Sequence, residues 1–377
     1  MPLRITSAGL LFLSVFLAGD ATSLGSPLNA SSSGDSLNRP ARTAGTPRSR
    51  SPHRRSSRPR WRWNGNSYLR GYYDDNILDY SRRDRDLFTS RAHPNKFSIL
   101  SADDWITDVG AFVERRRGAK SRREYRLRLS GNGHWYARNV IKNWLDYDLE
   151  GRWASPRRAL IAHVGWTPHF YLRDLLLRDT ANPHPATPSY ARAGYHSWTG
   201  DLEYRLRQGL PAEQRLAAGW KRTSYNRAFN ERNSTTWWGS YGWVMPIHDR
   251  WEASWDYRYS HFGADGARQA DAVIDVSHHE HEWEAGLQYQ SKSSWTVGID
   301  VAYQLELYTS QKPADPYHVG RRDHEWRLQS EVRIPAGGGW QIRLLEHWTQ
   351  ATSNRPETSD FGAYNDNQFG ARLARSW

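Results

Sequence analysis

The chain has 377 residues, a mean hydropathy of -0.86 and no cysteine. The hydropathy excludes a helical membrane protein, and the lack of cysteine excludes disulfide and thiol chemistry. The net charge of +12 does not indicate nucleic-acid binding, because ten arginines and only two aspartates lie within residues 1–62.

The first 60 residues predict a leader and an arm. Arg4 precedes the apolar run 10–18, and Gly19-Asp20-Ala21 is an acceptable cleavage site, so residues 1–21 are predicted to be a secretory signal peptide. The run is too short to be a spanning anchor. Residues 22–60 are rich in Ser, Pro and Arg and are predicted to be a disordered arm. We interpret it as a solvated linker; the alternatives are contact with anionic lipid headgroups, with a periplasmic partner, or with the lumen of a barrel formed by residues 61–377.

Residues 61–377 alternate apolar and polar side chains with the period of a β-strand. The hairpin at 282–307 is the clearest case: Trp283, Leu287 and Val301 belong to an apolar set, and Glu282 and Glu284 to a polar set. Strands of about ten residues whose apolar face begins and ends in Trp or Tyr are typical of strands that cross a bilayer. The alternative, a soluble sheet, would bury this face in a core.

In chain order, about fourteen strands (roughly twelve to sixteen) can be placed. They lie near 63–73, 105–115, 122–130, 143–153, 158–171, 190–207, 214–225, 235–247, 250–261, 282–290, 294–307, 323–334, 340–350 and before 377. The strand near 158–171 is apolar on both faces, so its sidedness is not predicted. The fold class is therefore all-β: a transmembrane antiparallel up-and-down barrel over 61–377.

The connections alternate between short and long. Short ones are predicted near 117–121, 154–157, 208–213, 248–249, 291–293 and 336–339, and long ones near 74–104, 131–142, 172–189, 226–234, 262–280, 309–322 and 351–366. Bacterial outer-membrane barrels have short periplasmic turns and long outer loops, and an even strand number puts both termini in the periplasm.

Aromatic residues make up 13% of the chain and fall into two rows. The row at the short-turn ends is Trp251, Trp295, Trp340 and Trp377, and the row at the long-loop ends is Trp283, Trp326 and Trp348. Amphipathic rings at both headgroup levels of a membrane explain such rows.

Two short motifs carry a family resemblance. The ending Phe369-Gly-Ala-Arg-Leu-Ala-Arg-Ser-Trp377 resembles the C-terminal strand of Gram-negative outer-membrane β-barrels, although Arg375 departs from the apolar pattern. The stretch from Tyr72 to Leu78 resembles the opening of porin-like barrels. The resemblance implies an outer-membrane location and a C-terminal strand that the barrel-assembly machinery reads; lipid and lipopolysaccharide would surround the barrel.

The polar faces carry charges of both signs. The residues predicted to line the lumen are Asp148, Glu150, Arg152, Glu203, Arg205, Asp256, Arg258, Glu284, Asp300, Glu306, Arg327, Glu331, Arg333 and Arg343. Such charges must face water or each other. They either line a selective passage or fill a closed lumen with cross-strand ion pairs.

Other candidate sites are weaker. Asp74-Asp75-Asn76 with Asp79 offers oxygens to a hard cation, but Asp/Asn clusters more often form turns. His279 and His281 share a face, and two ligands alone do not form a metal site. The pairs His196-Ser197, Ser260-His261 and Ser277-His278 are not catalytic dyads by themselves, because neighbours in a strand face opposite ways. We predict no catalytic residue, metal or cofactor.

The favoured interpretation is a porin-like outer-membrane channel for diffusion of small hydrophilic solutes through a charged lumen. The alternative is a non-conducting outer-membrane barrel with a structural, assembly or export role. A lipid-active barrel enzyme is less favoured, since no Ser–His–acid triad is evident in the sequence.

Overall fold

The computed structural model describes residues 61–118, 123–177, 189–207, 212–269, 272–313, 315, 317–355 and 363–377. The predicted signal peptide, 1–21, and the predicted arm, 22–60, lie outside the described residues. Among the described residues no helix is long and apolar enough to cross a membrane.

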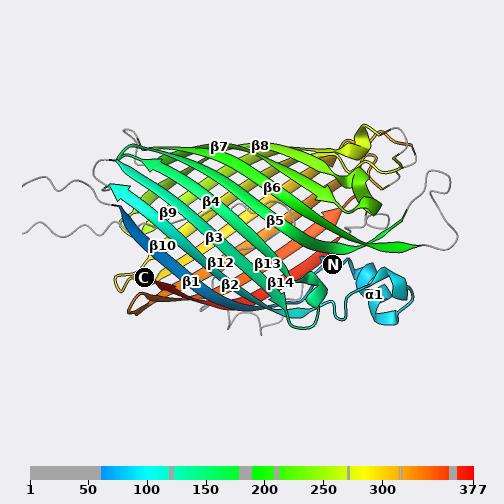
Figure 1. The fold of residues 1–377 in the computed structure, drawn as a ribbon, viewed down its shortest axis with the longest axis horizontal. Coiled ribbons are helices and arrows are strands. Elements are labelled where there is room, and N and C mark those ends of the chain that lie inside the picture. The colour runs from blue at the N-terminus through cyan, green and yellow to red at the C-terminus, as the bar shows by residue number, and fades with distance from the viewer. Residues whose placement is uncertain are drawn as a thin grey trace, which may run out of the picture.

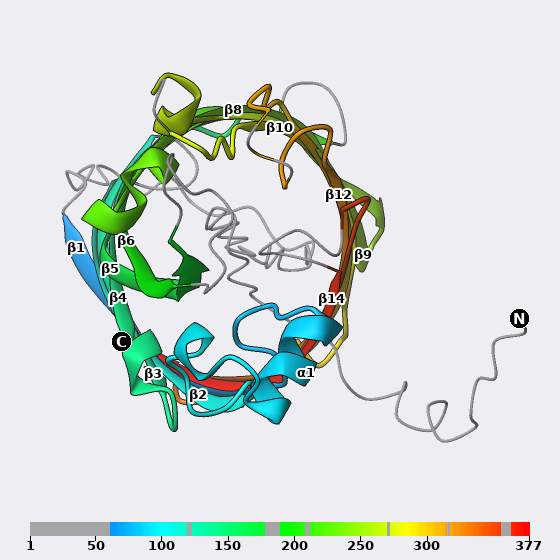
Figure 2. The same cartoon turned by 90° about the vertical axis from the view of Figure 1, so that its right-hand side faces the viewer.

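Fourteen antiparallel strands close into one barrel, which confirms the predicted fold class (Figure 1). The strands are β1 (Arg62–Asp74), β2 (Asp104–Gly118), β3 (Glu124–Tyr136), β4 (Trp144–Ala154), β5 (Arg158–Leu176), β6 (Tyr190–Leu206), β7 (Glu213–Tyr225), β8 (Ser234–His248), β9 (Trp251–Ala264), β10 (His278–Gln290), β11 (Thr296–Tyr308), β12 (Arg322–Gly337), β13 (Trp340–Ser353) and β14 (Tyr364–Ser376). Each strand pairs with its neighbours in the chain, and β1 pairs with β14 to close the ring (Figure 2).

Apolar side chains cover the outside of the barrel. In β10 and β11, Leu287 lies opposite Ile299 and is 41% exposed, and Val301 is 40% exposed. The next residue along each strand points inward, because strand side chains alternate between faces. This register also settles β5: Leu160 is 39% exposed on the outer face, whereas Ile161 is 7% exposed on the inner face.

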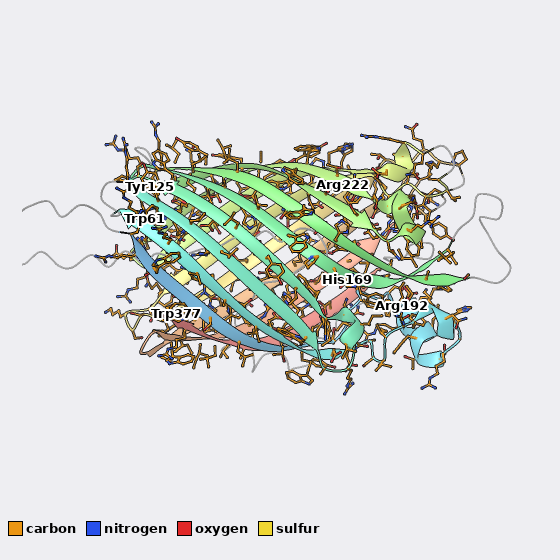
Figure 3. All side chains as sticks on the ribbon, in the orientation of Figure 1. Trp61, Tyr125, His169, Arg192, Arg222 and Trp377 are labelled. Carbon is orange, nitrogen blue, oxygen red and sulfur yellow. The ribbon has the colours of Figure 1, made fainter. Side chains whose placement is uncertain are left out.

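The connections alternate in length between the two ends of the barrel. One end has the short links 119–123, 155–157, 207–212, 249–250, 291–295 and 338–339, and the other has the long links 75–103, 137–143, 177–189, 226–233, 265–277, 309–321 and 354–363. Both ends of the barrel sequence meet at the short-turn end, where the backbone N–H of Trp377 donates to the carbonyl of Gly65 at 3.1 Å. Figure 3 shows Trp61, Tyr125 and Trp377 at this end.

The long-loop end carries the helical elements: α1 (Arg82–Ser90) and the short 3-10 turns η1 (Pro94–Lys96), η2 (Val140–Lys142), η3 (Arg227–Arg232) and η4 (Asp265–Ala267). The Ser81 side chain caps α1 by accepting a hydrogen bond from the backbone N–H of Asp84 at 3.1 Å. A small apolar cluster packs between the link 75–103, which contains α1, and the strands β1, β2 and β5. Its buried members are Tyr72, Ile77, Leu78, Tyr80, Ile99, Ile106 and Tyr171.

Candidate functional site in the barrel lumen

The strand register determines which side chains face the lumen. Arg258 on β9 lies opposite Glu282 on β10, on the face away from the exposed aromatic residues. The same alternation places all of the charged residues predicted for the lumen on the inner wall: Asp148, Glu150, Arg152, Glu203, Arg205, Asp256, Arg258, Glu284, Asp300, Glu306, Arg327, Glu331, Arg333 and Arg343. Their role in lining a passage stays a prediction.

Ion pairs connect neighbouring strands along the short-turn half of this wall. The Arg126 guanidinium lies 2.5 Å from the Glu150 carboxylate and 3.5 Å from that of Glu114. Arg128 also contacts Glu114, at 3.2 Å. Because each charge meets the opposite charge on the next strand, this part of the wall is largely self-compensated.

A second network surrounds Glu282 on β10. Its carboxylate forms close ion pairs with Arg258 on β9 and with Arg327 on β12. The side chains of all three residues are less than a tenth exposed. Arg327 also contacts Glu325 at 3.3 Å. Glu282 therefore joins three strands, β9, β10 and β12, because Arg327 reaches across β11.

Two inward histidines, which the sequence analysis did not single out, bridge pairs of aspartates. His134 contacts Asp108 through Nδ1 at 2.7 Å and Asp146 through Nε2 at 3.0 Å. His163 contacts Asp148 at 2.9 Å and Asp201 at 3.0 Å. The alternation of strand side chains could have predicted that both histidines face inward, because each stands on the polar face of its strand.

A cavity of about 250 Å³ opens inside the barrel near the long-loop end. Five carboxylates line it, Asp79, Glu306, Asp323, Glu325 and Asp366, together with the cationic Lys221 and Arg232. Its aromatic lining is Tyr195, Tyr225, Phe262, Tyr308 and Tyr364. Of the charged residues predicted for the lumen, Glu306 borders this cavity. The others named above lie along the wall.

Loop residues near the cavity have perturbed acidities. Burial raises the pKa of Asp79 to about 6, and Asp79 also adopts a left-handed backbone conformation with φ of 52°. Burial lowers the pKa of Lys142 to about 8, and its ammonium donates to the carbonyl of Ile77 at 2.7 Å. Burial also lowers the pKa of His318, which contacts Asp315 at 2.9 Å. Strained and buried ionisable groups of this kind concentrate at functional sites.

The Asp74-to-Asp79 motif forms a corner rather than an open ring of oxygens. The buried Asn76 side chain donates to the carbonyls of Tyr80 and Asn365, at 3.0 and 3.1 Å, and accepts from the Tyr80 N–H at 2.9 Å. Asp75 accepts from the backbone and side-chain amides of Asn367. The motif thus joins the start of the first loop to β14.

The seven predicted interface tryptophans lie on or beside the outer face. Trp251, Trp295, Trp340 and Trp377 are 37–65% exposed at the short-turn end. Trp283, Trp326 and Trp348 lie further along the strands towards the long loops, and the Tyr303 ring lies 5.7 Å from Trp283 and 4.7 Å from Trp326. Arg375, the departure in the C-terminal pattern, places its guanidinium 5.2 Å from the Trp340 ring. Contact of the seven tryptophans with lipid headgroups stays a prediction.

His279 and His281 share the outer face, where they bond to the hydroxyls of Tyr259 and Tyr257 at 2.7 and 2.9 Å. The adjacent His278 and Glu280 point inward instead. The Ser260-His261 pair is split in the same way: Ser260 donates inward to Glu280 at 3.4 Å, while His261 contacts His279 on the outside.

No protein-family model and no curated protein matches the chain. Similar solved structures include OccAB3 of Acinetobacter baumannii, at 12% identity and a TM-score of 0.38, covering 84% of this chain and 99% of that one. An anion-selective porin from Comamonas acidovorans has 8% identity and a TM-score of 0.40, covering 85% and 100%. The outer-membrane protein OpdK from Pseudomonas aeruginosa has 11% identity and a TM-score of 0.40, covering 84% and 99%. Such values assign no substrate to this chain.

Proposed function

We propose that this protein is an outer-membrane channel, porin-like in action, that lets small hydrophilic solutes diffuse through a charged lumen. The observation that carries the proposal is the reversed polarity of the closed barrel. Aliphatic side chains such as Leu129, Leu202 and Leu373 are 42–60% exposed on the outside, and charged side chains line the inside. A barrel that is apolar outside and polar inside suits a bilayer around it and water within it.

The cavity supports a preference for cations over anions. Its five carboxylates outnumber Lys221 and Arg232, so the field at this point of the lumen is negative. Rings of acidic side chains favour cations in the same way in other pores. The solute would be small, because the cavity has a volume of only about 250 Å³.

The proposed location is the bacterial outer membrane, with the short turns and both barrel termini in the periplasm. The alternation of link lengths supports this orientation. Strand β14 would then be read by the barrel-assembly machinery, because Phe369, Leu373 and Trp377 present an apolar outer face next to the closing seam.

The paired wall charges favour a second candidate, a non-conducting barrel with a structural, assembly or export role. In networks such as Arg258–Glu282–Arg327, charges on nearby strands compensate each other. No catalytic step is proposed for either candidate.

Single-channel conductance in planar bilayers distinguishes the two. The channel predicts discrete steps that grow with salt, and a reversal potential in a salt gradient with the sign of a cation-selective pore. Protein that is folded and inserted but never conducts would overturn the channel and leave the second candidate. An anion-selective reversal potential would retain the channel but contradict the role of the cavity carboxylates.

A further inference from the structure

Three side chains that can bind a metal meet where β10 and β11 reach the cavity. Ligand atoms of His278, Glu280 and Glu306 all lie within 4.8 Å of one another. Glu280 and Glu306 are directly opposite in the register of the two strands, and His278 is on the same inward face two residues before Glu280. All three are half-buried, and His278 and Glu306 line the cavity, so a solute in the lumen can reach them.

The two glutamates lie directly opposite each other, so a cation bound between them would be favourable. Like charges directly opposite each other destabilise an antiparallel pair. Arg258 contacts Glu280 at 3.5 Å, but its closer ion pair is with Glu282. Glu306 accepts hydrogen bonds from two neutral groups, the Gln304 amide at 2.8 Å and the Tyr308 hydroxyl at 3.1 Å.

His278 is oriented as a ligand. Its Nδ1 lies 2.9 Å from the Val276 carbonyl, and because a carbonyl only accepts, Nδ1 is the donor, which leaves Nε2 as the metal-binding atom of the neutral ring. The ring is nearly parallel to Phe262, with centroids 4.6 Å apart, and lies 5.1 Å from the Tyr308 ring. Metal-binding histidines usually donate their second ring N–H to a carbonyl or carboxylate in this way.

The carboxylates are oriented as well. The Gln304 and Tyr308 bonds fix both oxygens of Glu306, and the Ser260 hydroxyl donates to Glu280 at 3.4 Å. These contacts come from the strands of the barrel wall rather than from the loops. Closing separations of at most 4.8 Å to the roughly 3.4 Å between ligands of a tetrahedral zinc is within reach of flexible glutamate side chains.

We propose that His278, Glu280 and Glu306 bind a divalent first-row transition-metal cation on the wall of the lumen. One imidazole and two carboxylates match Zn²⁺ and its neighbours, whereas Mg²⁺ and Ca²⁺ prefer oxygen ligands alone. Three protein ligands leave a coordination position open to water. The site does not require the barrel to conduct, so it goes beyond the proposed channel function.

The test is a calorimetric titration of the purified full chain in detergent with ZnCl₂. The same titration with MgCl₂ is the comparison. We expect one Zn²⁺ per chain and at least a tenfold weaker response to Mg²⁺. His278→Ala and Glu306→Gln should each weaken Zn²⁺ binding more than tenfold. His279→Ala is the matched control, because it removes the neighbouring imidazole from the outer face and should leave binding unchanged.

Two outcomes would overturn the site: no saturable Zn²⁺ binding by the folded barrel, or binding that is lost in His279→Ala but kept in His278→Ala. The second result would assign the metal to the outer histidines His261, His279 and His281. Glu306→Gln keeps the size of the side chain, and heat-modifiable migration on a gel verifies that each variant folds. Zinc binding without conductance would retain the site and reject the channel, so the two proposals fail separately.

Discussion

Arg327 on β12 reaches across β11 to form a close ion pair with Glu282 on β10. The side chains of both residues are less than a tenth exposed, and Glu282 also holds Arg258. Removing one member of a buried pair leaves the other charge uncompensated, which costs about 3–5 kcal/mol. This arrangement predicts which of two substitutions lowers the free energy of unfolding more.

Glu282→Gln should destabilise the barrel more than Arg327→Met does. The first change deprives two guanidiniums of a partner, whereas the second leaves Glu282 paired with Arg258. We expect a loss of about 3 kcal/mol or more for Glu282→Gln, measured by denaturant unfolding of the refolded barrel. The Arg207 side chain is 63% exposed, so Arg207→Met should change the free energy of unfolding by less than about 1 kcal/mol. Equal effects of the two buried substitutions would contradict the shared network.

A charge on the outer face should be far more costly than one on the inner face. Leu287→Arg or Val301→Arg should lower the free energy of unfolding in lipid by about 2–4 kcal/mol, because both side chains would face hydrocarbon. Gln288→Arg should have little effect, since residue 288 faces the lumen opposite Glu252. Equilibrium unfolding in vesicles measures all three, and similar costs at positions 287 and 288 would show that the outer face does not contact lipid.

Strand faces were predictable from the sequence because the apolar side chains that point outward repeat every second residue over long strands. Helix α1 was not, because its sequence RRDRDLFTS has only two large apolar residues and its capping depends on the loop around it. The cavity also escaped prediction, since its lining comes from strands whose register the sequence does not specify. His278 and Glu306 illustrate this limit: parity predicts that each faces inward, but only the β10–β11 register brings them together.

The Asn76 corner should contribute to the stability of the loop end. Asn76 is 1% exposed, and its side chain makes three hydrogen bonds to backbone groups. Asn76→Ala should lower the free energy of unfolding by about 2–4 kcal/mol, because buried backbone groups lose their partners. Asn354→Ala is the control: this exposed side chain makes similar bonds to Arg322 and Gly320, and its loss should cost under about 1 kcal/mol.

Cation preference should fall as the pH decreases through about 6. Burial raises the pKa of Asp79 to about 6, so its carboxylate is charged above this pH and neutral below it. Loss of this charge makes the cavity less negative. The pKa of His318 is lowered by burial, so its positive charge develops mainly below its ordinary range. Reversal potentials in a salt gradient, measured between about pH 7.5 and 5, should show this fall in cation preference.

Asp79→Asn removes the titrating group and keeps its shape. This variant should show the weaker cation preference already at neutral pH, with a flatter profile through about pH 6. An unchanged step in Asp79→Asn would assign the titration to another group of the lumen.

Zinc should reduce conductance if both the channel and the metal site exist. A bound divalent cation would sit beside the cavity and offset the charge of Glu280 and Glu306, so it would obstruct the lumen and repel other cations. We expect addition of ZnCl₂ to lower single-channel conductance with the same midpoint as calorimetric binding, and MgCl₂ to have little effect. His278→Ala should lose the block by zinc, while His279→Ala should remain sensitive. Block that persists in His278→Ala would separate the effect from this site, because the imidazole is the ligand that distinguishes zinc from magnesium.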